Sequence, residues 1–284
     1  MFSKLASRLR SNNVTPGLVW IYVRKLAHQA LSSRPERHSI LAVLGCQRSG
    51  TSVMSRVFFR DLDVVVFREK SVLTGGAEGL RYLPFDELNA YLAKQRAPFI
   101  VFKMLVESQR ARDFLNTVDG ARVVWLFRNY RDIVNSNLTK FGIRNGIDDL
   151  RPIVNEEEDN WRSEACSEET RNTIRKYFSE SMNPRDAAAL FWYARNRLYF
   201  EQELFRDNRV MLMEYENFVR NPASTMRQMY ELCDRPYPGD YLVAEVATGS
   251  ISKGRNIDLS PEVDELCNNM LTRLQDAARN SDIS

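Results

Sequence analysis

Residues 40–52 (ILAVLGCQRSGTS) constrain the fold of this chain more than any other stretch. Their first five residues form an apolar run that predicts a buried strand. Residues 45–50 predict a tight loop, and Thr51 is expected to begin a helix. A strand, a glycine-bounded loop and a helix in direct succession are typical of phosphate-binding loops in parallel α/β proteins.

The loop follows the pattern G-x-x-x-x-G-K-[ST] except for its lysine. Both glycines and the final hydroxyl residue, Ser52, are present, but Thr51 stands in the lysine position and the positive charge lies inside the loop at Arg48. Backbone N–H groups at a helix N-terminus bind anions without that lysine. Because the lysine normally reaches the β- and γ-phosphates, its loss argues against a magnesium-dependent nucleoside triphosphatase.

Alternating strands and helices predict the rest of the fold. Further buried strands are expected at 64–67, 99–102, 123–127 and 209–213, and helices at 51–59, 85–96, 108–117, 132–140, 184–205, 222–233 and 261–279. This alternation indicates right-handed crossovers and therefore an α/β fold with three layers, a parallel central sheet flanked by helices. Arg48, Glu69, Lys103 and Arg128 each follow a predicted strand, at the sheet edge where ligands bind.

The length of the chain and the distribution of its charges predict its domain organisation. Its 284 residues suit one α/β domain with insertions, and the net charge of +3 gives no nucleic-acid footprint. Residues 1–37 hold seven Lys/Arg and one Glu, which predicts a basic helical N-terminal extension before a main domain at 38–284. This extension could be a transit peptide, or an amphipathic helix on the domain or on a membrane surface. Residues 142–183 form an acidic insertion, either a lid or a solvated helical excursion.

The spacing of the cysteines indicates the redox state of the compartment. The four cysteines form no C-x-x-C pair, which favours free thiols in a reducing compartment, and no run approaches the length of a membrane span. We therefore expect a cytoplasmic location, with membrane-surface association through the N-terminus and a homodimer left open.

Three groups of residues predict anion binding. The loop 45–52 is the first, Arg128 with Ser136 is the second, and the sequence Lys-Gly-Arg at 253–255 is the third. Any one of them alone could be a structural ion pair or a chance match. Together at one sheet edge they indicate a ligand with two separated anionic groups.

These motifs resemble those of sulfotransferases that use 3′-phosphoadenosine 5′-phosphosulfate. The pattern G-x-x-R-S-G-T-[ST] follows the first strand, and R-x-x-R-D-x-x-x-S follows a later one. Phe-Lys at 102–103, MEYENF at 213–218, Asn-Pro at 221–222 and the basic loop at 253–255 also match that layout. The resemblance spans roughly residues 38–275 and implies the P-loop NTPase-like sulfotransferase fold. In having an arginine in the loop, the chain resembles the bacterial and tyrosylprotein branches of that family.

The resemblance also implies the donor contacts. Gln47, Arg48, Ser49, Gly50, Thr51 and Ser52 would hold the 5′-phosphosulfate, and Arg128, Ser136, Lys253, Gly254 and Arg255 the 3′-phosphate. Arg48 would stabilise charge on the leaving phosphate. Tyr215 would lie near the adenine, although a core tyrosine at a strand end is an alternative.

A general base located after the loop must be a residue other than histidine, because both histidines precede the loop. The cytosolic branch has a histidine just after the lysine of the intermediate strand, but Met104 follows Lys103 here. The tyrosylprotein branch uses a glutamate at the end of the second strand, where this chain has Glu69. Partial burial would let Glu69 accept the proton of the acceptor hydroxyl. Glu78 and Glu107 are alternatives, as is a purely structural ion pair, and Lys103 could stabilise the transferring group.

The resulting expectation is transfer of a sulfuryl group to a hydroxyl or amine, with no metal and no nucleic acid required. The acceptor could be a small molecule, carbohydrate, lipid or peptide. An atypical P-loop kinase or NTPase is the alternative enzyme, disfavoured by Thr51 and by Arg128 where an aspartate would hold magnesium. A nucleotide-binding scaffold without activity is a further alternative.

Overall fold

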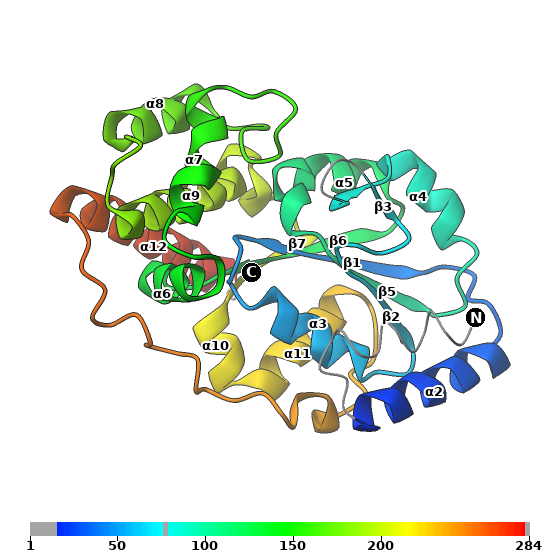
Figure 1. Cartoon of the computed structure of the whole chain (residues 1–284). Helices are drawn as coiled ribbons and strands as arrows, with labels where there is room; N and C mark the ends of the chain where they lie inside the picture. Colours follow the sequence, from blue (N-terminus) through cyan, green and yellow to red (C-terminus); the bar gives the residue numbers. More distant parts are fainter. Residues whose placement is uncertain (1–15, 76–78, 282–284) are drawn as a thin grey trace.

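A five-stranded parallel sheet forms the centre of the protein (Figure 1). A computed structural model describes residues 16–75 and 79–281. The strands are β1 (Ser39–Gly45), β2 (Val64–Phe67), β5 (Phe99–Lys103), β6 (Ala121–Phe127) and β7 (Val210–Glu214), in the order β2-β5-β1-β6-β7. Strand β1 is central, with Ile40 beside Ile100 of β5 and Ala121 of β6. The predicted strands and their parallel arrangement are confirmed.

Helices cover both faces of the sheet, which makes the three layers. One face carries α4 (Phe85–Leu92), α5 (Ala111–Thr117), α6 (Tyr130–Phe141), α7 (Asn145–Val154), α9 (Pro184–Glu201) and α12 (Pro261–Ser281). The other carries α3 (Thr51–Phe59), α10 (Tyr215–Arg220) and α11 (Pro222–Leu232). Within β1, Ala42 packs toward the first face and Val43 toward the second, so both sides of the strand are buried.

Several element ends differ from the sequence prediction. The helix expected over 85–96 ends at Leu92, and the one expected over 108–117 is a 3-10 turn, η1 (Leu105–Arg110), followed by α5. Helix α9 starts at Pro184, with the Asn183 side chain accepting from the backbone of Arg185. It ends before 205 because Glu203 adopts a left-handed conformation with φ of 51°.

Two short strands pair with each other outside the central sheet. Strand β3 (Thr74–Gly75) pairs in antiparallel fashion with β4 (Arg81–Tyr82). Glu78, the alternative base, lies outside the described residues.

The insertion at 142–183 belongs to the main core. It forms α7 and α8 (Glu168–Tyr177), and Leu150, Ile153 and Ile174 are fully buried in the core cluster on the α9 side. Its carboxylates are largely paired with arginines, as in Asp149 with Arg162 at 2.5 Å. A low content of apolar residues therefore did not mean an unpacked segment, and a lid function stays a prediction.

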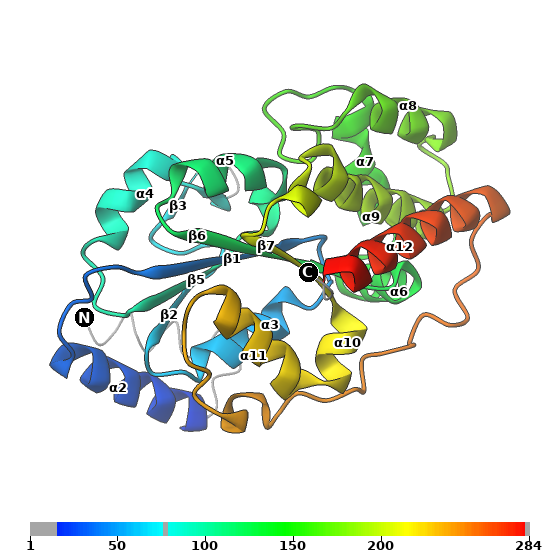
Figure 2. The same ribbon diagram turned by 180° about the vertical axis from the view of Figure 1, so that it is seen from behind.

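Helix α2 (Pro16–Leu31), the described part of the N-terminal extension, packs beside α3 and β2 (Figure 2). Lys25 Nζ donates to the carbonyl of Phe59 at 2.6 Å, and His28 Nε2 lies 2.7 Å from Asp63 Oδ1. The predicted helix is therefore anchored to the domain. None of the helices within 16–75 and 79–281 has the length and apolar character needed to cross a bilayer.

Candidate functional site

A cavity of about 820 Å³ opens at the carboxyl edge of the sheet. Arg48, Glu69 and Arg128 follow β1, β2 and β6, Lys103 ends β5, and all four line the cavity. The structure thus brings together the four charged residues that the sequence placed at strand ends. Their convergence agrees with the rule that open parallel sheets bind ligands at this edge.

The two loop glycines are required by close packing. A Cβ atom at Gly45 would lie 2.1 Å from the carbonyl oxygen of Leu126, and one at Gly50 would lie 2.2 Å from the Tyr215 ring. Both glycines have φ above +90° (131° and 100°), which favours glycine. Between them Arg48 has φ of 68°, an uncommon conformation for a residue with a side chain that is found preferentially at functional sites.

Arg48 and Arg128 place two guanidinium groups side by side. Arg48 Nε donates to Ser136 Oγ at 2.9 Å, and Arg128 Nη1 donates to the carbonyl of Arg48 at 3.3 Å. Burial lowers the pKa of Arg48, and the neighbouring charge of Arg128 lowers it further. A bound anion would oppose both effects, because it favours the charged form of Arg48.

Arg128 is 6% exposed and only partly satisfied. Its Nη2 donates to the carbonyl of Ser250 at 2.5 Å and pairs with Asp132 at 3.4 Å. Its Nε atom is buried and has no hydrogen-bond partner within the described chain, with Glu216 Oε1 at 4.0 Å. A buried unpaired donor is costly, so the Arg128 guanidinium gains from a further acceptor at this wall.

Tyr215 closes the same side of the cavity. The Arg128 guanidinium lies 4.7 Å from the centre of its ring, and its hydroxyl bonds to Ser250 Oγ at 2.8 Å. The ring is 3% exposed and lines the cavity. Contact with adenine stays a prediction, because the ring already supports both Gly50 and Arg128.

The basic loop at 253–255 is held by Asp132, which the sequence interpretation overlooked. Asp132 accepts from the backbone N–H groups of Ser252 at 2.8 Å and Gly254 at 2.7 Å. A Cβ atom at Gly254 would lie 2.1 Å from the carbonyl oxygen of Arg131, so this glycine serves contact between two segments of the chain. The available signal was an acidic residue in the first turn of α6, one helical turn after Arg128.

Not every predicted donor contact faces the cavity. Gln47, Arg48, Gly50, Thr51, Ser52, Arg128, Ser136, Tyr215 and Lys253 line it. Ser49 is fully buried, with a hydroxyl that has no partner within the described chain, and it is absent from the lining. Gly254 and Arg255 line a neighbouring hollow of about 380 Å³. Their roles toward a ligand stay predictions.

Glu69 and Lys103 form an ion pair at the opposite side of the cavity. Lys103 Nζ lies 2.7 Å from Glu69 Oε2, and both side chains are 13% exposed. The backbone N–H of Leu105 donates to the other carboxylate oxygen at 3.4 Å. Glu69 would become a free proton acceptor once Lys103 turned to another anionic partner, such as a transferring group.

Glu107, an alternative base, is not among the residues that line the cavity. It is 1% exposed and accepts from the backbone N–H of Tyr82 at 2.8 Å and from Arg81 Nε at 3.1 Å. Burial raises its pKa, although Arg81 opposes that shift. With its acceptor sites directed at protein donors and no access to the cavity, Glu107 is positioned for a structural role.

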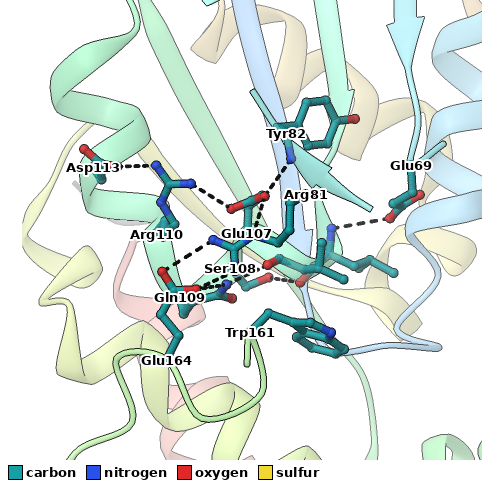
Figure 3. A network of polar contacts seen from close by, with 12 residues as sticks. Glu69, Arg81, Tyr82, Glu107, Ser108, Gln109, Arg110, Asp113, Trp161 and Glu164 are labelled. Carbon is teal, nitrogen blue, oxygen red and sulfur yellow. Dashed lines mark hydrogen bonds and ion pairs between the residues drawn. The ribbon is translucent and has the colours of Figure 1, made fainter. Parts of the chain in front are cut away.

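A polar network extends from Glu107 to the insertion (Figure 3). Arg81 also pairs with Glu164 at 2.6 Å, and Gln109 donates to Glu164 at 2.9 Å. Arg195, 2% exposed, donates to Gln109 Oε1 at 3.0 Å and to the carbonyls of Leu105 and Trp161, both at 3.3 Å. Burial lowers the pKa of Arg195 to about 10, so it remains a cation at neutral pH.

Several residues that line the cavity were missed by sequence reasoning. They include Arg56, Leu80, Leu105, Val106, Asn145, Trp161 and Arg162, together with Lys140 and Phe141. None belongs to a local motif. They meet only because α3, the segment after β5, α6 and the insertion converge at this edge.

Both the sequence and the fold are similar to those of known proteins. A family model described as a sulfotransferase domain matches residues 39–262. The solved sulfotransferase domain from the curacin biosynthetic pathway is similar in structure, with a TM-score of 0.54, 12% identity, and coverage of 86% of this chain and 99% of that one. For the sulfotransferase from Alicyclobacillus acidocaldarius the values are 0.51, 14%, 86% and 97%. No curated protein has a significant match. At these identities the structural similarity shows the fold alone.

Proposed function

Since this chain belongs to the sulfotransferase family, we propose that it transfers a sulfuryl group from 3′-phosphoadenosine 5′-phosphosulfate to a hydroxyl or amine of an acceptor. The observation that carries the donor assignment is that two groups of anion-binding residues line one cavity. One is the loop with Arg48, and the other is Arg128 with Ser136 and Lys253. A nucleotide phosphorylated at both the 3′ and 5′ positions matches two such groups, whereas a linear polyphosphate matches the first alone.

The residues present suit the chemistry of that donor. Backbone N–H groups at the start of α3 and the Arg48 guanidinium would stabilise negative charge on the 5′-phosphate as the S–O bond to it breaks. Lys103 would neutralise the transferring sulfuryl group. As the acceptor oxygen or nitrogen forms its bond to sulfur, its proton would pass to the Glu69 carboxylate. The products are the sulfated acceptor and 3′-phosphoadenosine 5′-phosphate.

Calorimetric titration with 3′-phosphoadenosine 5′-phosphate tests the donor. We expect micromolar affinity that falls at least about 100-fold in Arg128→Ala, because a buried charge-assisted contact is lost. Arg144→Ala is the control, since this arginine is largely exposed and pairs on the outside of the insertion. Circular dichroism would confirm that both variants fold.

Two results would redirect the proposal. Equal affinity for ADP would contradict a site built for a 3′-phosphate, and magnesium-dependent ATP hydrolysis would favour the kinase or NTPase alternative.

A screen of phenols, alcohols, lipids, sugars and tyrosine peptides with this donor would identify the acceptor. Donor binding without any turnover in that screen would favour an inactive scaffold.

A further inference from the structure

Helix α2 carries an unusual concentration of exposed apolar side chains. Eleven large hydrophobic residues are exposed in the described chain, and six of them lie in this one helix: Val19, Trp20, Tyr22, Val23, Leu26 and Leu31. Trp20 is 63% exposed and Leu26 51%. Single exposed apolar residues are ordinary, but a contiguous group on one element indicates an interaction surface.

The opposite face of α2 is fixed to the domain. Lys25, His28 and Gln29 bond to residues between the end of α3 and the start of β2: Lys25 to Phe59, His28 to Asp63 and Gln29 to the carbonyl of Leu62. Arg96 reaches the carbonyl of Ala30 from the other side. The exposed face is therefore held outward, and both overall views place α2 at the periphery of the molecule (Figures 1 and 2).

The charge around this face is positive. Arg24, Arg34 and Arg37 are exposed and form no ion pair with any described residue. Residues 1–37 as a whole carry seven Lys/Arg against Glu36 alone, a net charge of +6. Asp63, a neighbouring acid, is already paired with His28 and with Arg235. A partner for this surface should thus be both apolar and negatively charged.

We propose that α2 docks the protein onto an anionic lipid bilayer. The helix lies in the plane of the interface, with Trp20, Val23 and Leu26 inserted among the acyl chains and Arg24 at the headgroups. Arg34 and Arg37, just after the helix, add attraction to anionic lipid. Apolar burial and a basic segment are the two signals that stable peripheral binding needs, and this segment of the chain carries both.

The tryptophans provide a direct test in the unmodified full chain. Trp125, Trp161 and Trp192 are buried, so Trp20 is the exposed reporter. With vesicles of phosphatidylcholine containing phosphatidylserine, we expect co-sedimentation, a blue shift of the emission and protection of Trp20 from acrylamide. Vesicles of phosphatidylcholine alone, or high salt, should weaken binding at least about tenfold, because attraction to anionic lipid is electrostatic.

Variants separate this surface from the rest of the molecule. Trp20→Glu with Val23→Glu should abolish co-sedimentation, and Arg34→Glu with Arg37→Glu should weaken it about tenfold or more. Val72→Glu with Phe205→Glu, at exposed apolar positions elsewhere, should leave it unchanged. Affinity for 3′-phosphoadenosine 5′-phosphate should be the same in all of them.

Three outcomes would overturn the proposal. The first is no vesicle binding by the full chain, or equal binding by the Trp20→Glu, Val23→Glu variant. The second is a dimer in analytical ultracentrifugation that this variant dissociates, which would assign the surface to a second copy. The third is protection of Trp20 from acrylamide without vesicles, which would mean that the chain itself covers the face.

Discussion

The two sides of the cavity use charge in opposite ways. The first, the loop wall, comprises Gln47, Arg48, Gly50, Arg128, Ser136, Tyr215 and Lys253. The second, the network wall, comprises Leu105, Val106 and Trp161, backed by Arg81, Glu107, Gln109, Glu164 and Arg195. In the loop wall, the buried Nε atom of Arg128 has no hydrogen-bond partner among the described residues. In the network wall, the charged groups bond to one another or to backbone. The side chains that this wall presents to the cavity are mainly apolar.

This difference indicates a division of labour. Unsatisfied hydrogen-bonding groups gain most when a charged ligand arrives, so the loop wall suits an invariant donor. A wall whose charged groups are already paired, although Trp161 Nε1 has no partner within the described residues, fixes the shape of a pocket and contributes contact surface, as an acceptor site requires. Glu69 and Lys103 lie between the two, where a group would pass from donor to acceptor.

The largest effect should come from the boundary between the walls. Glu69→Gln keeps the size of the side chain and an oxygen for Lys103, but removes the proton acceptor. We expect turnover to fall by about 10²–10⁴-fold with unchanged affinity for 3′-phosphoadenosine 5′-phosphate. The measurements are a steady-state assay with the identified acceptor and calorimetry.

Glu245→Gln is the control for that substitution, because Glu245 is an exposed glutamate far along the chain. Turnover of Glu69→Gln within about twofold of the unmodified enzyme would remove Glu69 from the mechanism.

The loop wall should respond next, through donor binding. Gly50→Ala places a methyl group 2.2 Å from the Tyr215 ring at a φ of 100°, so the loop or the ring must move. We expect affinity for 3′-phosphoadenosine 5′-phosphate to fall about 10–100-fold in calorimetry, since backbone N–H groups lose their alignment. Gly249→Ala is the matched control, because nothing lies within 4 Å of its added methyl group. Equal losses in both variants would refute the steric explanation.

The loop wall was largely predictable because its signals are local. Strand, glycines, Arg48 and helix start follow one another within residues 40–52, and the charges after β2, β5 and β6 could be placed at one edge from the parallel arrangement alone. The pairing of Glu69 with Lys103 was not predictable. It depends on β2 lying beside β5, an order that the sequence does not state.

The network wall could not be read from the sequence for a physical reason. Its members are ordinary arginines, glutamates and a glutamine from distant segments, and each has a meaning only beside its partners. Trp161 lies in the acidic insertion and Arg195 in the helix predicted at 184–205, and neither belongs to a motif. Counting charges predicted an acidic insertion, whereas the fold pairs most of those carboxylates with arginines.

Substitution at the centre of the network wall should have a smaller effect on activity, and that effect should be confined to acceptor binding. Arg195→Met removes a buried guanidinium and leaves Gln109 Oε1 and the carbonyls of Leu105 and Trp161 without their donor. We expect a loss of roughly 3 kcal/mol in the free energy of unfolding and an increase of about tenfold in the acceptor KM. Urea denaturation and steady-state kinetics measure these, and donor affinity should stay within about twofold.

Arg197→Met is the matched control, because Arg197 lies two residues further along α9 and pairs with Glu169 and Glu201 away from the network. A donor affinity that fell in Arg195→Met but not in Arg197→Met would show that the two walls are coupled and would contradict their division of labour.

The smallest effect concerns pH and the outer end of the network. Burial raises the pKa of Glu164, but hydrogen bonds from Arg81 and Gln109 outweigh this effect, so the pKa is lowered overall. For Glu107, burial raises the pKa. A carboxyl whose pKa is lowered by folding stabilises the protein above its unfolded pKa, about 4.3, and loses that contribution as pH falls through the folded value. Glu164→Gln should therefore cost about 1–2 kcal/mol at pH 7 in urea denaturation, with the difference from the unmodified protein shrinking below pH ~4.

Glu107→Gln should show the opposite trend, because a raised pKa favours the folded state at low pH and that contribution is lost as pH rises. Its difference from the unmodified protein should thus be larger in acid than at neutral pH. Since both glutamates bind Arg81, opposite trends would mean that the buried and the outer ends of the network wall are held by different forces. Parallel trends would mean that Arg81 dominates both carboxylates and that burial of Glu107 contributes little to the wall.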